Sequence, residues 1–144
     1  MSTLFTGGCA CGAIRYACTA EPLLSLNCHC RDCQQASGTA FAAIMRVPAA
    51  AFTVTKGAPR FYMVTGDSGN TVSRGFCSEC GSPLFSRLSG MSDVVGVRVG
   101  SLDDPRPYHA TMDIFVVSAQ PWDNMDPELP KFPSYPKGVA PKQT

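Results

Sequence analysis

Seven of the eight cysteines in this 144-residue chain fall in three short clusters. The clusters are Cys9 and Cys11 as C-x-C, Cys28, Cys30 and Cys33 as C-x-C-x-x-C, and Cys77 and Cys80 as C-x-x-C. Zinc is held by thiolates at tetrahedral corners, and structural sites draw them from close pairs on separate segments. A closed set of four is typical of a structural site, whereas a set of three leaves a position for water or substrate. The pattern therefore predicts two unequal zinc sites.

Spacing alone leaves open which clusters share an ion, because the pair at Cys77 and Cys80 could complete either upstream cluster. Joining that pair to Cys9 and Cys11 uses every clustered cysteine and leaves only Cys18 over. Cys18 falls on the apolar side of its segment, so we expect it to be a buried small side chain.

Disulfides are the alternative use of eight cysteines. The N-terminal segment MSTLFTGGCACG has no apolar stretch typical of a signal peptide. No segment approaches the roughly 18 apolar residues of a membrane span. We therefore expect a cytoplasmic chain without a membrane partner, and such a chain more often uses clustered cysteines for metal than for disulfides.

The bulk composition fits one domain. Apolar residues make up 44% and charged residues 16% of the sequence. The formal charge of +1 falls by seven with seven thiolates and rises by four with two Zn²⁺, which gives −2. No Lys/Arg run is present, which argues against a nucleic-acid partner.

Short β-forming segments separated by Gly- and Pro-rich turns predict a mainly β fold. The expected strands, eight or nine in number, lie within 13–19, 23–28, 39–47, 53–55, 60–65, 71–76, 83–88, 94–99 and 111–117. Helical turns are expected only at 31–37 and 49–52. The predicted organisation is one domain over 1–132 and a Pro-rich C-terminal tail over 133–144, with Trp122, Leu129 and Phe132 anchoring the chain as it enters the tail.

Side chains two apart on an extended strand face the same way. This predicts that Cys9 and Cys11 can reach one ion, and likewise Cys28 and Cys30. His29 then faces away, and we expect it to pack or hydrogen-bond rather than to bind metal.

Three stretches, GGCACGAIRY, CHCRDCQQASG and RGFCSECGSPLF, together resemble the glutathione-dependent formaldehyde-activating enzyme family, which includes centromere protein V. The resemblance extends from about Gly7 to Phe132 and includes the SAQPWDN and LPKFP segments. It implies a single zinc-binding β-tent domain of short antiparallel strands. It also implies a structural zinc on Cys9, Cys11, Cys77 and Cys80, and a catalytic zinc on Cys28, Cys30 and Cys33. Asp113 departs from the family pattern, which usually has a histidine there.

By that resemblance the chain is a carbon–sulfur lyase that handles adducts of glutathione, or another small thiol, with formaldehyde or a related aldehyde. An open position on zinc deprotonates a bound thiol. Three protein thiolates leave the site with one net negative charge, which suits activation of a thiol better than of water.

The two carboxylates of glutathione call for cationic partners. Arg31, inside the triplet, is the best candidate for substrate binding, ahead of Arg15, Arg74 and Arg87. We expect Asp32 to stabilise its turn, and Tyr108 and His109 to serve in packing or turns.

A non-enzymatic zinc module that binds a protein partner is the alternative function. Redox repair on a similar zinc-bearing scaffold ranks low, because it needs an attacking cysteine in addition to the metal ligands, and none follows Cys80.

Overall fold

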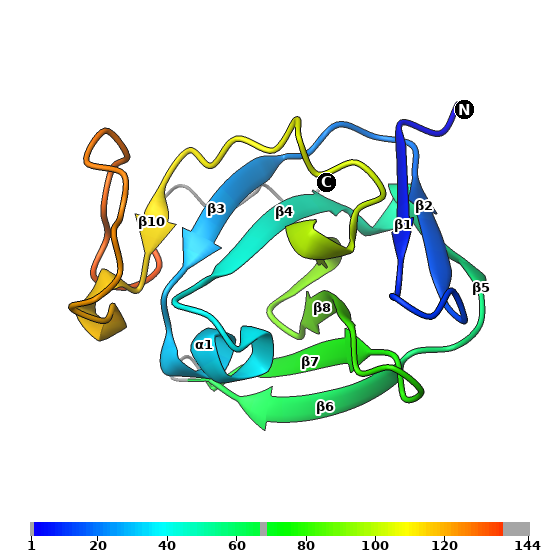
Figure 1. Ribbon diagram of the computed structural model, residues 1–144, viewed down its shortest axis with the longest axis horizontal. Coiled ribbons are helices and arrows are strands. Elements are labelled where there is room, and N and C mark those ends of the chain that lie inside the picture. The colour runs from blue at the N-terminus through cyan, green and yellow to red at the C-terminus, as the bar shows by residue number, and fades with distance from the viewer. Residues whose placement is uncertain (1, 67–68, 137–144) are drawn as a thin grey trace.

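The computed structural model describes residues 2–66 and 69–136, and within them it contains ten strands, one α-helix and three short 3₁₀ helices (Figure 1). The strands are β1 (Phe5–Gly8), β2 (Arg15–Cys18), β3 (Leu24–Cys28), β4 (Ala42–Pro48), β5 (Phe52–Lys56), β6 (Arg60–Thr65), β7 (Thr71–Phe76), β8 (Pro83–Leu88), β9 (Met91–Arg98) and β10 (Asp113–Ile114). The helix is α1 (Arg31–Ser37), and the 3₁₀ helices are η1 (Ala49–Ala51), η2 (Val99–Ser101) and η3 (Val116–Ser118). The predicted mainly β class is confirmed.

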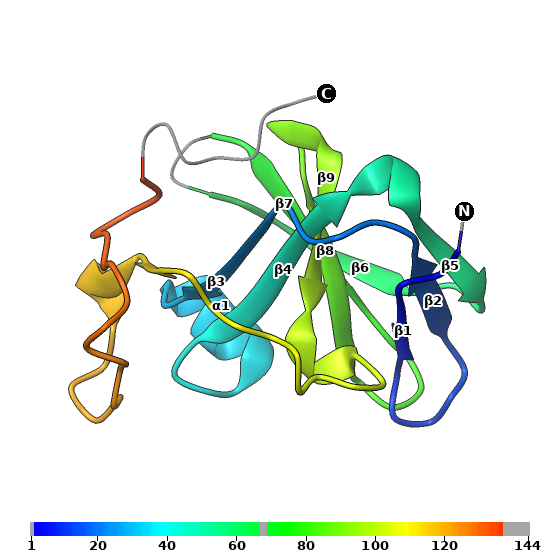
Figure 2. The same ribbon diagram turned by 90° about the horizontal axis from the view of Figure 1, so that it is seen from above.

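The strands form two sheets. A three-stranded sheet has the order β1-β2-β5, and a seven-stranded sheet has the order β10-β3-β4-β9-β8-β7-β6. Neighbouring strands are antiparallel except for β10, which pairs in parallel with β3. The large sheet curves from β3 and β4 round to β7 and β6, with α1 inside the curve (Figure 1). Figure 2 shows the three-stranded sheet standing at one end of the molecule. The curvature brings segments far apart in sequence to face one another.

Two apolar clusters fill the space between these elements. The first joins the two sheets through Tyr16, Phe52 and Phe85 and includes Cys9 and Cys77. The second lies under α1 and β10, around Leu26 and Ile114, and includes Cys28 and Cys33. Each cysteine cluster is therefore attached to a different part of the core.

Strand β1 is the element that the sequence did not predict. Its residues FTGG carry two glycines, which are poor strand formers by propensity. A Cβ on Gly7 would collide with the hydroxyl of Tyr16 and lie 2.5 Å from the carbonyl oxygen of Ser101. The glycine is required because β1 runs close against its neighbours. Because glycine has a low strand propensity, the same residue explains why the strand was not predicted from the sequence.

The predicted strand at 111–117 is shortened to β10. Phe115 adopts a left-handed backbone conformation (φ 57°), and the chain continues into η3. Short helical turns are found at both predicted places, as α1 and η1, but the prediction that they occur only there is wrong, because η2 and η3 are two further helical turns.

The C-terminal segment folds back over β10. Backbone hydrogen bonds join Phe132 N–H to the carbonyl of Asp113 and Val116 N–H to the carbonyl of Phe132. Phe132 and Tyr135 pack against the second apolar cluster, and Leu129 is half-buried. Trp122 is 69% exposed, so its predicted role as an anchor is wrong. Residues 137–144 of the predicted tail lie outside the described residues, and the boundary at 133 stays a prediction.

Among the described residues, no helix has both the length and the apolar character needed to cross a membrane.

Candidate metal centres

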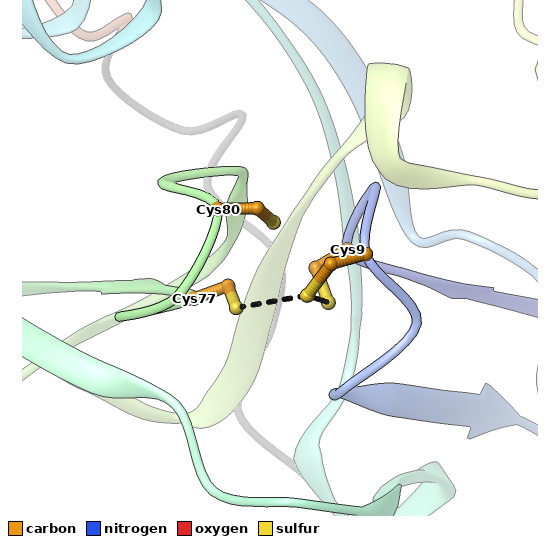
Figure 3. Close-up of side chains that lie close together, drawn as sticks. Cys9, Cys77 and Cys80 are labelled. Atoms are coloured by element: carbon orange, nitrogen blue, oxygen red, sulfur yellow. Dashed lines mark hydrogen bonds between the residues drawn. The ribbon is translucent and has the colours of Figure 1, made fainter.

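The four-cysteine cluster forms where two turns meet. Cys9 and Cys11 lie just after β1, and Cys77 and Cys80 lie between β7 and β8. Their four sulfurs all lie within 4.8 Å of one another. Figure 3 shows Cys77 and Cys80 on one turn facing Cys9 on the other.

The sulfur spacing suits a tetrahedral ion. The Cys9 and Cys11 sulfurs are 3.6 Å apart, and those of Cys11 and Cys77 are 3.7 Å apart. Four sulfurs at ordinary Zn–S distances on tetrahedral corners would stand about 3.8 Å apart. All eight cysteines are free thiols. The cluster therefore fits a zinc ion in both donor type and geometry.

The sequence analysis placed Cys9 and Cys11 on an extended strand, and that local geometry is wrong. β1 ends at Gly8, and a turn brings Gly12 N–H to the carbonyl of Cys9. Gly12 has φ 80°, a conformation that glycine adopts without strain. The turn, rather than side-chain alternation, gathers the two sulfurs.

Hydrogen-bond donors surround these sulfurs. Backbone N–H groups of Ile14 and Glu79 donate to the sulfurs of Cys9 and Cys77, at 3.2 and 3.4 Å. The Ser82 hydroxyl lies 3.2 Å from the Cys80 sulfur, and hydrogen bonds from the side chain and backbone of Ser82 lower the pKa of Cys80 to about 5. Such donors stabilise thiolates and orient metal ligands.

The three-cysteine cluster is built by a strand end and a helix start. Cys28 ends β3, Cys30 is the N-cap of α1, and Cys33 lies in the first turn of the helix. The N–H of Cys33 donates to the Cys30 sulfur at 3.3 Å, so the cap itself holds two sulfurs together. All three sulfurs lie within 4.8 Å of one another. Cys28 and Cys33 are buried and Cys30 is half-buried, so the cluster is open on the side of Cys30.

The surroundings of Cys33 favour its thiolate form. Hydrogen bonds from the thiols of Cys28 and Cys30, with smaller contributions from Arg98 and Arg74, lower the pKa of Cys33 to about 2. The Arg74 Nη2 lies 3.7 Å from its sulfur. These surroundings favour the anionic form that a metal requires.

His29 faces away from the sulfurs, as predicted, into a buried ionic network. Its Nε2 lies 2.9 Å from Asp113 Oδ1, and its Nδ1 lies 3.1 Å from Asp123 Oδ2. Lys131 Nζ donates to Asp113 Oδ2 at 3.1 Å. Asp113 is therefore the carboxylate that joins His29 to Lys131 of the C-terminal segment.

Gln34 completes the support of the triplet, and the sequence analysis did not single it out. Its Nε2 donates to the carbonyls of His29 and Ser118, at 2.7 and 2.9 Å. Its Oε1 accepts from Arg31 and Gln120. The side chain is buried and all of its hydrogen-bonding atoms are engaged.

Of the four arginines that were considered for substrate binding, Arg15 and Arg87 do not lie near the three-cysteine cluster. Arg31 is exposed, and with Cys30 and Asp32 it lines a hollow of about 320 Å³ that the η3 segment and Ser134 close on the other side. Arg15 forms an ion pair with Asp103, and Arg87 lies over the ring of Phe85, so neither faces the triplet.

Arg98 is the cation that sequence reasoning missed. It ends β9 in a run of buried valines and is itself only 7% exposed. A charged residue at the end of an apolar strand was the available signal. The Tyr108 hydroxyl donates to the carbonyl of Leu26, which agrees with the predicted packing role, and His109 is exposed.

Comparison with known proteins places these features in context. The family model described as "Glutathione-dependent formaldehyde-activating enzyme" matches residues 4–118. A protein of Emericella nidulans named "Putative glutathione-dependent formaldehyde-activating enzyme" is 26% identical over 136 residues, covering 87% of this chain and 68% of its own. A Penicillium rubens protein of the same name is 34% identical over 89 residues, covering 58% and 46%. A crystal structure of a Rhodobacter sphaeroides protein aligns with a TM-score of 0.56 at 24% identity, covering 71% of this chain and 93% of its own, which shows a shared fold.

Proposed function

Because the chain belongs to the glutathione-dependent formaldehyde-activating enzyme family, we propose that it is a zinc-dependent carbon–sulfur lyase acting at the three-cysteine cluster. Its substrates are adducts of glutathione, or another small thiol, with formaldehyde or a related aldehyde. Cys28, Cys30 and Cys33 hold the catalytic zinc, and Cys9, Cys11, Cys77 and Cys80 hold a structural one. A reducing compartment such as the cytoplasm keeps such thiolates available.

One observation carries this proposal: the two clusters differ in completeness. Among the described residues, the first cluster gathers four ligand sulfurs and the second gathers three. The second is half-open at Cys30, and the 320 Å³ hollow begins there. Three thiolates with an accessible position are the donor set of a site that exchanges a ligand.

The reaction balances without a redox partner. The thiol sulfur forms a bond to the aldehyde carbon, the carbon–oxygen double bond becomes single, and the thiol proton ends on the new hydroxyl oxygen. Zinc, when bound, supplies an open position that lowers the pKa of the incoming thiol. The N-cap hydrogen bond from Cys33 N–H holds the Cys30 sulfur in place, and Arg74 contacts the Cys33 sulfur and favours its thiolate. Arg31 and Asp32 line the hollow through which substrate reaches Cys30.

The test is the rate of adduct exchange. Zinc-loaded protein mixed with glutathione and formaldehyde should accelerate interconversion with S-hydroxymethylglutathione, as measured by exchange NMR. Cys33→Ser should lose the acceleration, while Arg106→Gln, which changes an exposed arginine paired with Asp104, should keep it. Exchange at the uncatalysed rate in fully zinc-loaded protein would reject the proposal.

A zinc module that binds a protein partner is the second candidate. Strand β6 ends the order of the seven-stranded sheet and exposes Phe61, Tyr62 and Met63. Exposed apolar residues on an edge strand are typical of a surface that pairs with another chain. This candidate predicts no acceleration of adduct exchange and loss of partner capture when Tyr62 and Met63 are replaced by serine.

A further inference from the structure

A second hollow, of about 180 Å³, lies between the two cysteine clusters. Ala36 of α1 forms one wall, and Gly81, which follows Cys80, forms another. Arg74 of β7 and Arg98 of β9 lie along it, and Tyr62, which is 64% exposed, stands at its edge. Helix α1, the large sheet and the turn that follows Cys80 thus surround a hollow that is lined by two arginines and reaches the surface.

One guanidinium nitrogen of Arg98 lacks an acceptor there. Its side chain is more than nine-tenths buried, and its Nη1 has no hydrogen-bond acceptor among the described residues. Among the described residues, the cationic members of the ion pairs are Arg15, Arg106, His29 and Lys131, and Arg98 is not one of them. A buried guanidinium nitrogen without an acceptor is costly, because the desolvation of its N–H groups is uncompensated.

Arg74 is only partly satisfied. Its Nη2 contacts the Cys33 sulfur at 3.7 Å, while its Nε is buried without a partner. A ligand bound to Arg74 would therefore be separated from the three-cysteine cluster only by the Arg74 side chain.

The charges leave room for one anion. Three thiolates and one Zn²⁺ would carry one net negative charge, which a single arginine balances. Arg74 contacts the Cys33 sulfur and Arg98 lines the same hollow, so one positive charge remains. Behind the cluster, Lys131 pairs with Asp113, and Asp113 and Asp123 both lie against the His29 ring.

We propose that Arg98, together with Arg74, binds a carboxylate of the substrate and makes the enzyme selective for acidic thiols. The planar guanidinium fork matches a carboxylate in geometry and charge. The hollow is smaller than the roughly 300–1,000 Å³ of sites that enclose a whole drug-sized ligand, so it takes one end of the molecule. The identity of the thiol rests on the proposed function, whereas the anion pocket does not.

S-methylglutathione isolates this contact, because it keeps both carboxylates but cannot form a thiolate. Its affinity for the zinc-loaded protein is measured by calorimetry beside that of its diethyl ester. We expect the ester to bind about tenfold to a hundredfold more weakly, the range for loss of hydrogen bonds to a charged group. Arg98→Gln should weaken the diacid by a similar factor and abolish the preference over the ester.

Arg46→Gln is the matched control. Arg46 is also a buried arginine of the large sheet with an unpartnered nitrogen, but it lies over Tyr135 and lines neither hollow. It should keep the preference for the diacid. Should Arg98→Gln lose zinc, Arg98→Lys, which keeps the charge without the fork, should bind the diacid with intermediate affinity.

Equal binding of diacid and ester by the wild-type protein would overturn the proposal without any mutant. So would an unchanged preference in zinc-loaded Arg98→Gln. Binding of the diacid that depends on Arg98, without any adduct exchange, would reject the proposed function and leave the anion pocket standing. Adduct exchange by the wild-type protein, together with unaltered binding of the diacid by Arg98→Gln, would support the proposed function and reject the anion pocket.

Discussion

The two cysteine clusters differ in what they join. The four-cysteine cluster links residues 68 positions apart in the chain, counted from Cys9 to Cys77, and connects the end of the three-stranded sheet to the large sheet. The three-cysteine cluster spans only Cys28 to Cys33. The N–H of Cys33 already donates to the Cys30 sulfur, and His29, which lies between the cysteines in sequence, is held by Asp113 and Gln34. A metal in the first cluster would cross-link the fold, whereas a metal in the second would bind to a scaffold that stands without it.

The largest expected effect is the contrast between Cys80→Ser and Cys33→Ser. Structural zinc contributes on the order of 10 kcal/mol to folding of small domains, which is comparable with the whole stability of a typical protein. We expect Cys80→Ser to lose its cooperative thermal transition. Cys33→Ser should retain the transition and lose only the second zinc, as measured by metal analysis and circular dichroism. Equal collapse of both variants would erase the distinction between the clusters.

Removal of Asp113 tests whether the triplet is supported by protein rather than by metal. Asp113→Asn leaves His29 and Lys131 without their buried carboxylate, a change that costs about 3 kcal/mol when one partner of a buried pair is removed. Asp104→Asn, at an exposed pair with Arg106, should cost less than about 1 kcal/mol. Urea denaturation of zinc-loaded protein measures both. A loss at Asp113 no larger than that at Asp104 would show that the buried network does not support the cluster.

A smaller effect distinguishes the two aromatic side chains of the returning segment. Phe132→Ala removes a half-buried ring from the cluster around Leu26 and should cost about 2 kcal/mol. Trp122→Ala removes an exposed ring and should stay within about 0.5 kcal/mol. Thermal unfolding of both variants gives the comparison. A larger loss at Trp122 would contradict the described packing of the segment.

The sequence predicted what depends on spacing and on periodicity. The strands β6, β7 and β8 lie within the expected bounds because each is a short run bounded by turn residues, and the helical turn after Cys30 was expected at 31–37. Spacing also defined the three cysteine clusters but left their pairing open, and the fold brings Cys77 and Cys80 to Cys9 and Cys11.

The remaining features depend on tertiary contacts that no local pattern encodes. β1 was missed because its glycines are needed for a neighbour, Tyr16, that lies in the next strand. Arg98 was missed because its significance arises only in the folded chain, where it lines a hollow together with Ala36 of α1. Trp122 was expected to anchor the C-terminal segment because of its residue type, but it lies in a turn and is exposed to solvent.

The most direct test of the account is a crystal structure of zinc-loaded protein with glutathione, using anomalous scattering at the zinc edge. The account predicts two zinc peaks, one bonded to the four sulfurs of Cys9, Cys11, Cys77 and Cys80, and one bonded to Cys28, Cys30, Cys33 and a ligand from outside the chain. A single peak, disulfides between the clusters, or a second zinc saturated by protein atoms would contradict it.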